Sequence, residues 1–136
     1  MNHSRCFVDT GHWLALANSN DHLHKRATTL AASLPGPFVT TEAVLLEVGD
    51  AMAGRKLRKL GAAVLADART DPEVEVVPLS PELFDNALRL YSARPDKEWS
   101  LTDCVSFVVM KERCIEEALA ADQHFTQAGF RALLLE

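Results

Sequence analysis

The sequence has few cysteines, and their number and spacing argue against two ways of stabilising a small fold. Cys6, Cys104 and Cys114 form an odd set with no CxxC pair. This arrangement argues against a disulfide framework and against a zinc–cysteine centre. Each cysteine lies among apolar neighbours in the sequence, so we expect all three to be small buried hydrophobic side chains.

The sequence also lacks an excess of basic charge and any long hydrophobic run. Lys and Arg number 14 against 19 Asp and Glu, which gives a net charge of −5. Proteins that coat nucleic acid through bulk charge are usually basic, so this balance argues against that mode of binding. The apolar stretches are too short to span a membrane, and the first residues do not resemble a signal peptide. We therefore expect a cytoplasmic protein.

The length and composition predict one globular domain. The chain has 136 residues, of which 48% are hydrophobic and 24% charged, and it contains no repeat or low-complexity tract. This length suffices for one domain with a hydrophobic core and is too short for two. We therefore expect residues 1–136 to form a single domain.

Short apolar runs alternate with segments of helical periodicity. Strands are expected at 6–8, 38–39, 74–77, 118–121 and 132–135. Helices are expected around 13–17, from a cap at Asn20 or Asp21 to Leu34, from a cap at Thr40 or Thr41 to Met52, and at 57–65, 80–91 and 100–114. This alternation predicts an α/β fold with a parallel sheet.

Acidic residues stand at the ends of predicted strands and near the starts of predicted helices. Asp9 follows the first strand, and Asp122 follows the strand expected at 118–121. Ligand sites in parallel α/β sheets form at the carboxyl ends of strands, so these two acids can converge. Asp103 lies in the first turn of a helix, and Glu47 lies on an apolar helical face, where an unpaired carboxylate is costly to bury.

A group of carboxylates suits a particular chemistry. Mg²⁺ and Mn²⁺ prefer oxygen ligands, and such ions can activate water and stabilise the charge that develops on a phosphodiester. Each acid also has a purely structural interpretation. Asp9 and Asp122 can cap the following helix or turn, Asp103 can complete a capping box with Ser100, and Glu47 can face solvent or pair with Arg55. Spacing alone leaves both interpretations open.

Segments spread over nearly the whole chain resemble the motifs of PIN domains. Residues 7–10 with 13–16 look like the first motif, and residues 41–48 look like the second, with Glu47 as its acid. Residues 99–107 closely resemble the third motif as VapC-like members carry it. Residues 118–125, followed by 128–130, resemble the fourth. The third and fourth motifs are the most specific.

The resemblance implies a three-layer α/β/α sandwich around a central parallel sheet, within a single PIN-like domain over residues 1–136. It implies a Mg²⁺- or Mn²⁺-dependent endoribonuclease, the toxin of a type II toxin–antitoxin pair, which forms a homodimer and binds a cognate antitoxin. It assigns catalysis and metal binding to Asp9, Glu47, Asp103 and Asp122. It assigns support of the first and third acids to the hydroxyl residues Thr10 and Thr102.

Other polar residues have two interpretations each. The basic cluster of Arg55, Lys56, Arg58 and Lys59 can contact RNA phosphates or an acidic partner, or it can be a solvated helix face with Leu57 and Leu60 turned inward. His12 and His124 can assist at the acidic site, although a surface or capping role is favoured for both. Trp13 is expected in the core, and Trp99 is expected to anchor the loop before Asp103.

Three alternatives to the toxin interpretation remain distinct. One is a PIN-like module that binds RNA or protein without cleaving it, and another is an RNA-processing nuclease outside any toxin–antitoxin system. A phosphatase with an aspartate nucleophile is the third. That class usually carries an Asp-x-Asp pair after its first strand, and here Thr10 and Gly11 follow Asp9, which argues against it.

Overall fold

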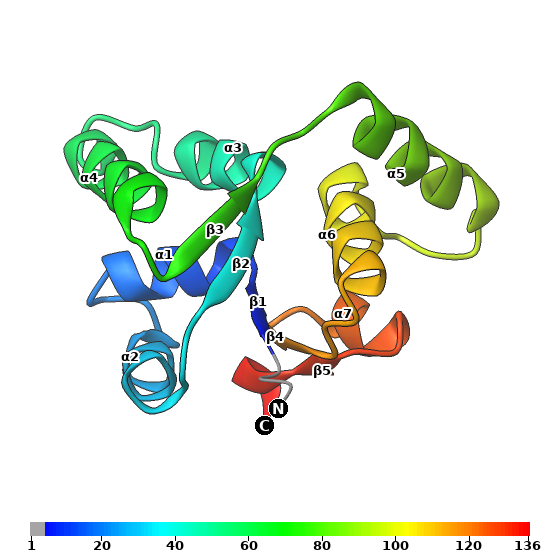
Figure 1. Cartoon of the computed structure of the whole chain (residues 1–136). Coiled ribbons are helices and arrows are strands. Elements are labelled where there is room, and N and C mark those ends of the chain that lie inside the picture. The colour runs from blue at the N-terminus through cyan, green and yellow to red at the C-terminus, as the bar shows by residue number, and fades with distance from the viewer. Residues whose placement is uncertain (1–4) are drawn as a thin grey trace.

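The computed structural model describes residues 5–136, and its centre is a five-stranded sheet. The strand order is β3-β2-β1-β4-β5, and every neighbouring pair is parallel (Figure 1). The strands are β1 (Cys6–Val8), β2 (Phe38–Thr41), β3 (Val74–Val77), β4 (Glu117–Leu119) and β5 (Arg131–Ala132). The parallel sheet predicted from the sequence is confirmed.

Helices cover both faces of the sheet and complete a three-layer α/β/α sandwich. The helices are α1 (Thr10–Ala17), α2 (His24–Ser33), α3 (Glu42–Ala51), α4 (Arg58–Thr70), α5 (Pro81–Ala93), α6 (Leu101–Glu112) and α7 (Gln123–Gln127). The chain steps from β1 to β2 to β3 in one direction, and then crosses back to β4 and β5. Because parallel crossovers are right-handed, this reversal places α1–α4 on one face and α5–α7 on the other, as Figure 1 shows.

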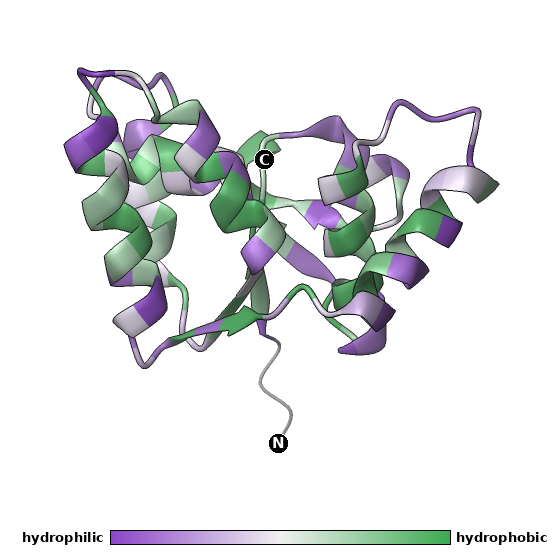
Figure 2. Ribbon diagram, turned by 90° about the horizontal axis from the view of Figure 1, so that it is seen from above, coloured by the Kyte–Doolittle hydropathy of each residue, from purple (hydrophilic) through white to green (hydrophobic). Residues whose placement is uncertain are grey.

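The central strand β1 is buried on both faces, which explains its uninterrupted apolar sequence. Cys6 and Val8 pack on the side of α2, with Leu30 and Leu34. Phe7 is fully buried on the opposite side, where its ring lies 6.3 Å from that of Phe125 in α7. Figure 2 shows the hydrophilic residues gathered on outer helical turns and in connecting loops.

An aromatic cluster joins α6 to α7 on the second face of the sheet. The ring of Phe107 in α6 meets Trp99 edge-on at 5.1 Å and Phe125 edge-on at 5.0 Å. Phe130 lies 5.7 Å from the same ring. Trp99 is buried and its indole N–H donates to Gln127, so it anchors the loop before Asp103 as predicted. The cluster therefore fixes α6 relative to α7.

Several predicted caps are confirmed, and one is wrong. Thr41 accepts a hydrogen bond from the backbone of Val44, and Ser80 caps α5 in the same way. Neither Asn20 nor Asp21 caps α2. The Asp21 carboxylate instead accepts from the backbone N–H of Leu23, which closes a turn, and the helix begins only at His24.

The carboxyl-terminal third differs from the sequence prediction in three places. The helix expected to reach Cys114 ends at Glu112, and Cys114 has a positive φ of 56° that is incompatible with a right-handed helix. Cys114 is exposed, so only Cys6 and Cys104 are buried as expected. The strand expected at 132–135 is wrong, because β5 ends at Ala132 and residues Leu133–Leu135 form a 3₁₀ turn. Within residues 5–136, no helix is long and apolar enough to cross a membrane.

Candidate metal and active site

The sheet places Asp9 where the strand order reverses. β1 pairs with β2 along one edge and with β4 along the other, and the backbone N–H of Asp9 donates to the carbonyl of Leu119 at 3.1 Å. Asp9 therefore leaves the carboxyl end of β1 directly beside the carboxyl end of β4. In open α/β sheets this reversal opens a crevice in which ligands bind. Asp9 is only 7% exposed there.

Glu47 reaches the same edge of the sheet from α3. This helix starts where β2 ends, and Glu47 lies about a turn and a half into it. The hydroxyl of Thr10, the first residue of α1, donates to Oε1 of Glu47 at 2.5 Å. Thr10 was expected to support the first acid through its hydroxyl, but that hydroxyl contacts the second acid. The backbone N–H of Thr10 is the group that stabilises the Asp9 carboxylate.

Asp103 combines its position at the site with a structural role. Its backbone N–H donates to the Ser100 hydroxyl at 2.9 Å, and its Oδ2 accepts from the Ser100 backbone at 3.1 Å. The capping box predicted as the structural interpretation is therefore confirmed. It orients the carboxylate of a residue that is 8% exposed, and the hydrogen bond to that carboxylate comes from the backbone of Ser100. Support of Asp103 by Thr102 stays a prediction.

Asp122 and His124, at the start of α7, add a fourth structural element to the acidic site. Oδ1 of Asp122 accepts from the backbone N–H of His124 at 2.8 Å and so caps α7. The imidazole of His124 then lies between two carboxylates, with Nε2 3.4 Å from Asp122 Oδ1 and Nδ1 3.8 Å from Asp103 Oδ2. One ligand atom from each of these three residues falls within 4.8 Å of the others.

The gathered carboxylates disturb one another's ionisation. Burial raises the pKa of Asp9 to about 7, the N–H of Thr10 opposes this rise, and the charges of the other three acids add to it. Burial also raises the pKa of Asp103, and the negative charges of Asp122 and Glu47 act in the same direction. The four acids therefore share one electrostatic environment. A divalent cation would offset the repulsion between them.

The residues present fit such a cation. They offer carboxylate oxygens, the ligands that Mg²⁺ and Mn²⁺ prefer, and an imidazole nitrogen that Mn²⁺ also accepts. Among the described residues, Nδ1 of His124 is buried and has no hydrogen-bond partner. An unpaired buried polar atom is costly, and a cation between His124 and Asp103 would remove that cost.

The model of the PIN domain family matches residues 6–131 of this chain. The chain belongs to the PIN-domain family. It is 34% identical over 124 residues to the protein named 23S rRNA-specific endonuclease VapC20 in two strains of Mycobacterium tuberculosis. That match covers 91% of this chain and 94% of the relative.

A solved structure supports the same assignment. The crystal structure of M. tuberculosis VapC20, a Sarcin-Ricin loop cleaving toxin, superposes on this chain with a TM-score of 0.87 at 32% sequence identity. The superposition covers 93% of this chain and 97% of that one. The PIN-like, VapC-like architecture expected from the sequence motifs is therefore confirmed.

Two further expectations about this PIN-domain chain are wrong. His12 was expected at the surface or in a cap, but it is 2% exposed, and burial lowers its pKa to about 4. Sequence spacing gave no sign of this, because His12 follows Gly11 in a short helix with little amphipathic pattern. Within the basic cluster, Leu57 packs against the core as expected, whereas Leu60 is exposed rather than turned inward.

Proposed function

We propose that this PIN-domain protein is an endoribonuclease that hydrolyses RNA phosphodiester bonds and acts as the toxin of a type II toxin–antitoxin pair. The observation that carries the proposal is the group of four carboxylates at the reversal of strand order, where burial and mutual repulsion raise the pKa of Asp9 to about 7. The similarity to VapC20, which is named an endonuclease of 23S rRNA, supports the same activity.

The acids that would hold the metal are Asp9, Glu47, Asp103 and Asp122, and the ion is Mg²⁺ or Mn²⁺. When bound, such an ion supplies positive charge for the phosphodiester oxygens and lowers the pKa of a water molecule. The chain itself fixes the direction of three of these carboxylates. Thr10 holds Glu47, Ser100 holds Asp103, and the backbone of His124 holds Asp122. Such supporting contacts pre-organise a site before its ligand arrives.

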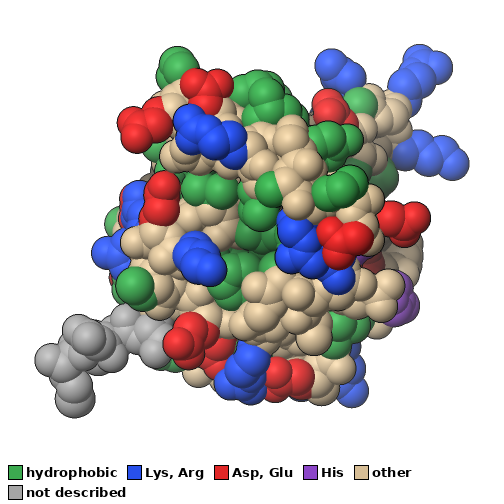
Figure 3. All heavy atoms as spheres, turned by 90° about the vertical axis from the view of Figure 1, so that its right-hand side faces the viewer, with side chains coloured by type: hydrophobic (Ala, Val, Ile, Leu, Met, Phe, Trp, Pro, Cys, Tyr) green, Lys and Arg blue, Asp and Glu red, His purple; other side chains and the backbone are tan. Residues whose placement is uncertain are grey.

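RNA recognition in this proposal does not come from a uniformly basic surface. The face formed by α5, α6 and α7 carries acidic and basic side chains close together (Figure 3). In the loop between α5 and α6, Arg94 pairs with Asp96 and stacks over Trp99. Binding therefore depends on shape and on the site itself. We propose the sarcin–ricin loop of 23S rRNA as the first substrate to test, because VapC20 is described as a toxin that cleaves that loop.

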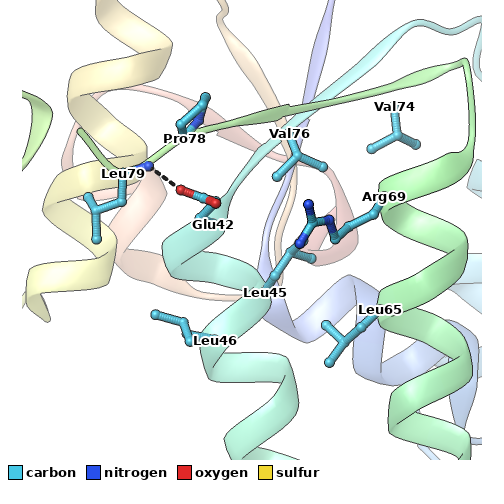
Figure 4. Close-up of a pocket in the computed structure, with 9 residues that line it drawn as sticks. All are labelled: Glu42, Leu45, Leu46, Leu65, Arg69, Val74, Val76, Pro78 and Leu79. Carbon is cyan, nitrogen blue, oxygen red and sulfur yellow. Dashed lines mark hydrogen bonds between the residues drawn. The ribbon is translucent and has the colours of Figure 1, made fainter.

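We further propose a cytoplasmic homodimer that binds a cognate antitoxin. A groove of about 650 Å³ runs between α3, α4 and β3, and Leu46 lies at its edge with 63% of its surface exposed (Figure 4). Leu45, Leu65 and Val76 line it, and Glu42 closes one end by accepting from the backbone of Leu79 at 2.6 Å. This exposed apolar surface is the one we assign to the dimer contact.

The activity is tested by incubating the purified protein with intact ribosomes and with an RNA hairpin that carries the sarcin–ricin sequence. We expect cleavage with Mg²⁺ or Mn²⁺ and none after chelation with EDTA. Cleavage that continues in EDTA would contradict the metal proposal. Binding to the RNA without cleavage under all metal conditions would favour the non-catalytic module. A short neighbouring gene for a DNA-binding protein that suppresses the activity would support the toxin–antitoxin pairing.

A further inference from the structure

We propose that His124 is itself a metal ligand, together with Asp103 and Asp122, and that its imidazole makes the site prefer Mn²⁺ over Mg²⁺. The inference rests on the proposed metal-binding function of the acids. It goes beyond that function because it adds a nitrogen donor to a set of oxygen donors.

The positions of the donor atoms suit a shared ion. Metal–ligand bonds to nitrogen and oxygen are about 2.1 Å long, so two ligands of one ion lie roughly 3 to 4.2 Å apart. Nδ1 of His124 lies 3.8 Å from Asp103 Oδ2, which falls within that interval. One ligand atom from each of His124, Asp103 and Asp122 lies within 4.8 Å of the others, which is close to the spacing that one ion requires.

The two ring nitrogens of His124 have different surroundings. Nδ1 is buried, faces Asp103 and has no hydrogen-bond partner within the part of the chain that the structure describes. Nε2 faces Oδ1 of Asp122, the oxygen that also caps α7. Imidazoles that bind metal through one nitrogen commonly direct the other at a carboxylate, which fixes the ring. We therefore assign Nδ1 as the metal donor, with Asp122 Oδ1 orienting the ring.

Neither the helix cap nor the packing of α7 explains the position of the imidazole. The cap of α7 uses only the backbone N–H of His124, which any residue except proline supplies. Packing of Phe125 against Phe7 and Phe107 already secures α7. Nδ1 has no hydrogen-bond partner among the described residues, and the polar neighbours of the ring are the carboxylates of Asp103 and Asp122. The imidazole therefore places a nitrogen donor between two of the proposed metal ligands.

A nitrogen donor changes which ion the site prefers. Mg²⁺ binds almost entirely through oxygen, keeps several waters and demands a regular octahedron. Imidazole suits the divalent ions of the first transition series, whose affinities rise from Mn²⁺ toward Cu²⁺. The His124 site should therefore bind Mn²⁺ more tightly than Mg²⁺, and Co²⁺ more tightly than Mn²⁺.

The experiment measures binding and ligation without using activity. Calorimetric titrations of the metal-free full chain with Mn²⁺, Co²⁺ and Mg²⁺ are compared for the wild type, His124→Gln and the control His22→Gln, whose parent side chain is 88% exposed. We expect His124→Gln to weaken Mn²⁺ binding about tenfold or more and Mg²⁺ binding much less. Pulsed electron paramagnetic resonance of the Mn²⁺ complex should show ¹⁴N coupling from imidazole in the wild type and in His22→Gln, and not in His124→Gln.

The outcomes separate this inference from the proposed function. Absence of ¹⁴N coupling in wild-type protein that binds Mn²⁺ overturns the role of His124 and leaves the acids as ligands, and this measurement needs no variant. Persistence of the coupling and of the Mn²⁺ preference in His124→Gln has the same meaning. Failure of the wild type to bind any of the three ions overturns the metal site as a whole, and the inference with it.

Discussion

The hydroxyl of Thr10 lies 2.5 Å from Oε1 of Glu47, and this contact joins the start of α1 to the middle of α3. The two residues are 37 positions apart in the sequence and belong to elements that leave neighbouring strands, β1 and β2. The same threonine presents its backbone N–H to Asp9. One residue therefore orients Glu47 and also moderates the pKa of Asp9.

Replacing Thr10 with valine should weaken metal binding while preserving the fold. Valine has nearly the same shape but cannot donate to Glu47, so the carboxylate loses its fixed direction. Loss of such a supporting contact typically lowers metal affinity about 10- to 100-fold. Calorimetry with Mn²⁺ measures the change, and Thr28→Val is the matched control, because the exposed Thr28 hydroxyl only contacts the carbonyl of Lys25. Equal affinities for both variants would show that the contact does not support the site.

The two roles of Asp103 can be separated with a pair of substitutions. Asp103→Asn keeps a side-chain oxygen for the capping box but gives a poor ligand for a hard cation, so RNA cleavage should almost disappear while stability changes little. Ser100→Ala should do the reverse, with a stability loss of about 1 kcal/mol and substantial residual cleavage. Thermal unfolding and a cleavage assay on both variants provide the measurements. Full activity in a folded Asp103→Asn protein would refute the catalytic assignment.

The metal-free protein should become less stable as the pH rises toward 8. The folded-state pKa of Asp9 is about 7, against an ordinary value of 3.8, so the folded state binds the carboxyl proton of Asp9 more tightly than the unfolded state does. Protonated Asp9 therefore stabilises the folded state, fully at a pH below the pKa of Asp9 in the unfolded chain. This stabilisation is lost as the pH rises through about 7. At about 1.4 kcal/mol per pKa unit, the loss is on the order of 4 kcal/mol.

Urea unfolding between pH 4 and 8 in EDTA measures this dependence. Asp9→Asn should flatten the profile, since asparagine carries no titrating proton, and Mg²⁺ or Mn²⁺ should restore stability to the wild type at pH 8. A wild-type protein whose stability rises steadily from pH 5 to 8 without metal would contradict the raised pKa of Asp9.

The fold was predictable from the sequence where the local residue pattern and the tertiary environment favour the same secondary structure. The doubly buried strand at 6–8 and the Ser80–Pro81 helix start both follow from short-range chemistry, and both are confirmed. The end of the chain was predicted wrongly. Leu133 and Leu134 are equally compatible with a strand and with a buried 3₁₀ turn. Only the packing of the turn beside β4 decides between them.

The site was predictable in its acids and not in its supporting contacts. Placement after strands indicated Asp9 and Asp122, and helix position indicated Asp103, so each acid had a local signal. The partners of these acids lie far away in sequence: the hydroxyl of Thr10 meets Glu47, and the ring of His124 meets Asp103. The proximity of His124 to Asp122 in the sequence was the available sign that His124 lies at the site. A single histidine in a short helix has no periodic pattern, however, that would show which way its side chain points.

Truncation of Phe107 should damage both the fold and the site. Its ring contacts Trp99, Phe125 and Phe130 and thereby couples α6, which carries Asp103, to α7, which follows Asp122. Phe107→Ala should reduce the free energy of unfolding by about 3 to 5 kcal/mol. Phe107→Leu should cost less and still reduce Mn²⁺ affinity. Urea unfolding and calorimetry check the two effects, and an unchanged affinity in Phe107→Leu would show that the cluster does not position the acids.

The proposed dimer contact predicts a change of mass in solution. Leu46→Glu places a charge on the exposed apolar edge of the groove beside α3 and should convert the dimer into a monomer. Leu135→Glu is the matched control, since Leu135 is another exposed leucine, at the carboxyl-terminal end of the chain. Light scattering after size exclusion distinguishes the two states. A dimeric mass for Leu46→Glu would move the interface to another face.

The reversal of strand order has a consequence for the time at which the acidic cluster first exists. Asp9 is made long before Asp122, yet β1 and β4, which carry them to the same edge, are direct neighbours in the sheet. A ribosome must therefore synthesise the chain through β4 as far as Asp122 before the cluster can close, and a fragment that ends before β4 contains three of the acids without the fourth. A nascent copy of this protein thus has no complete acidic cluster until β4 has paired with β1.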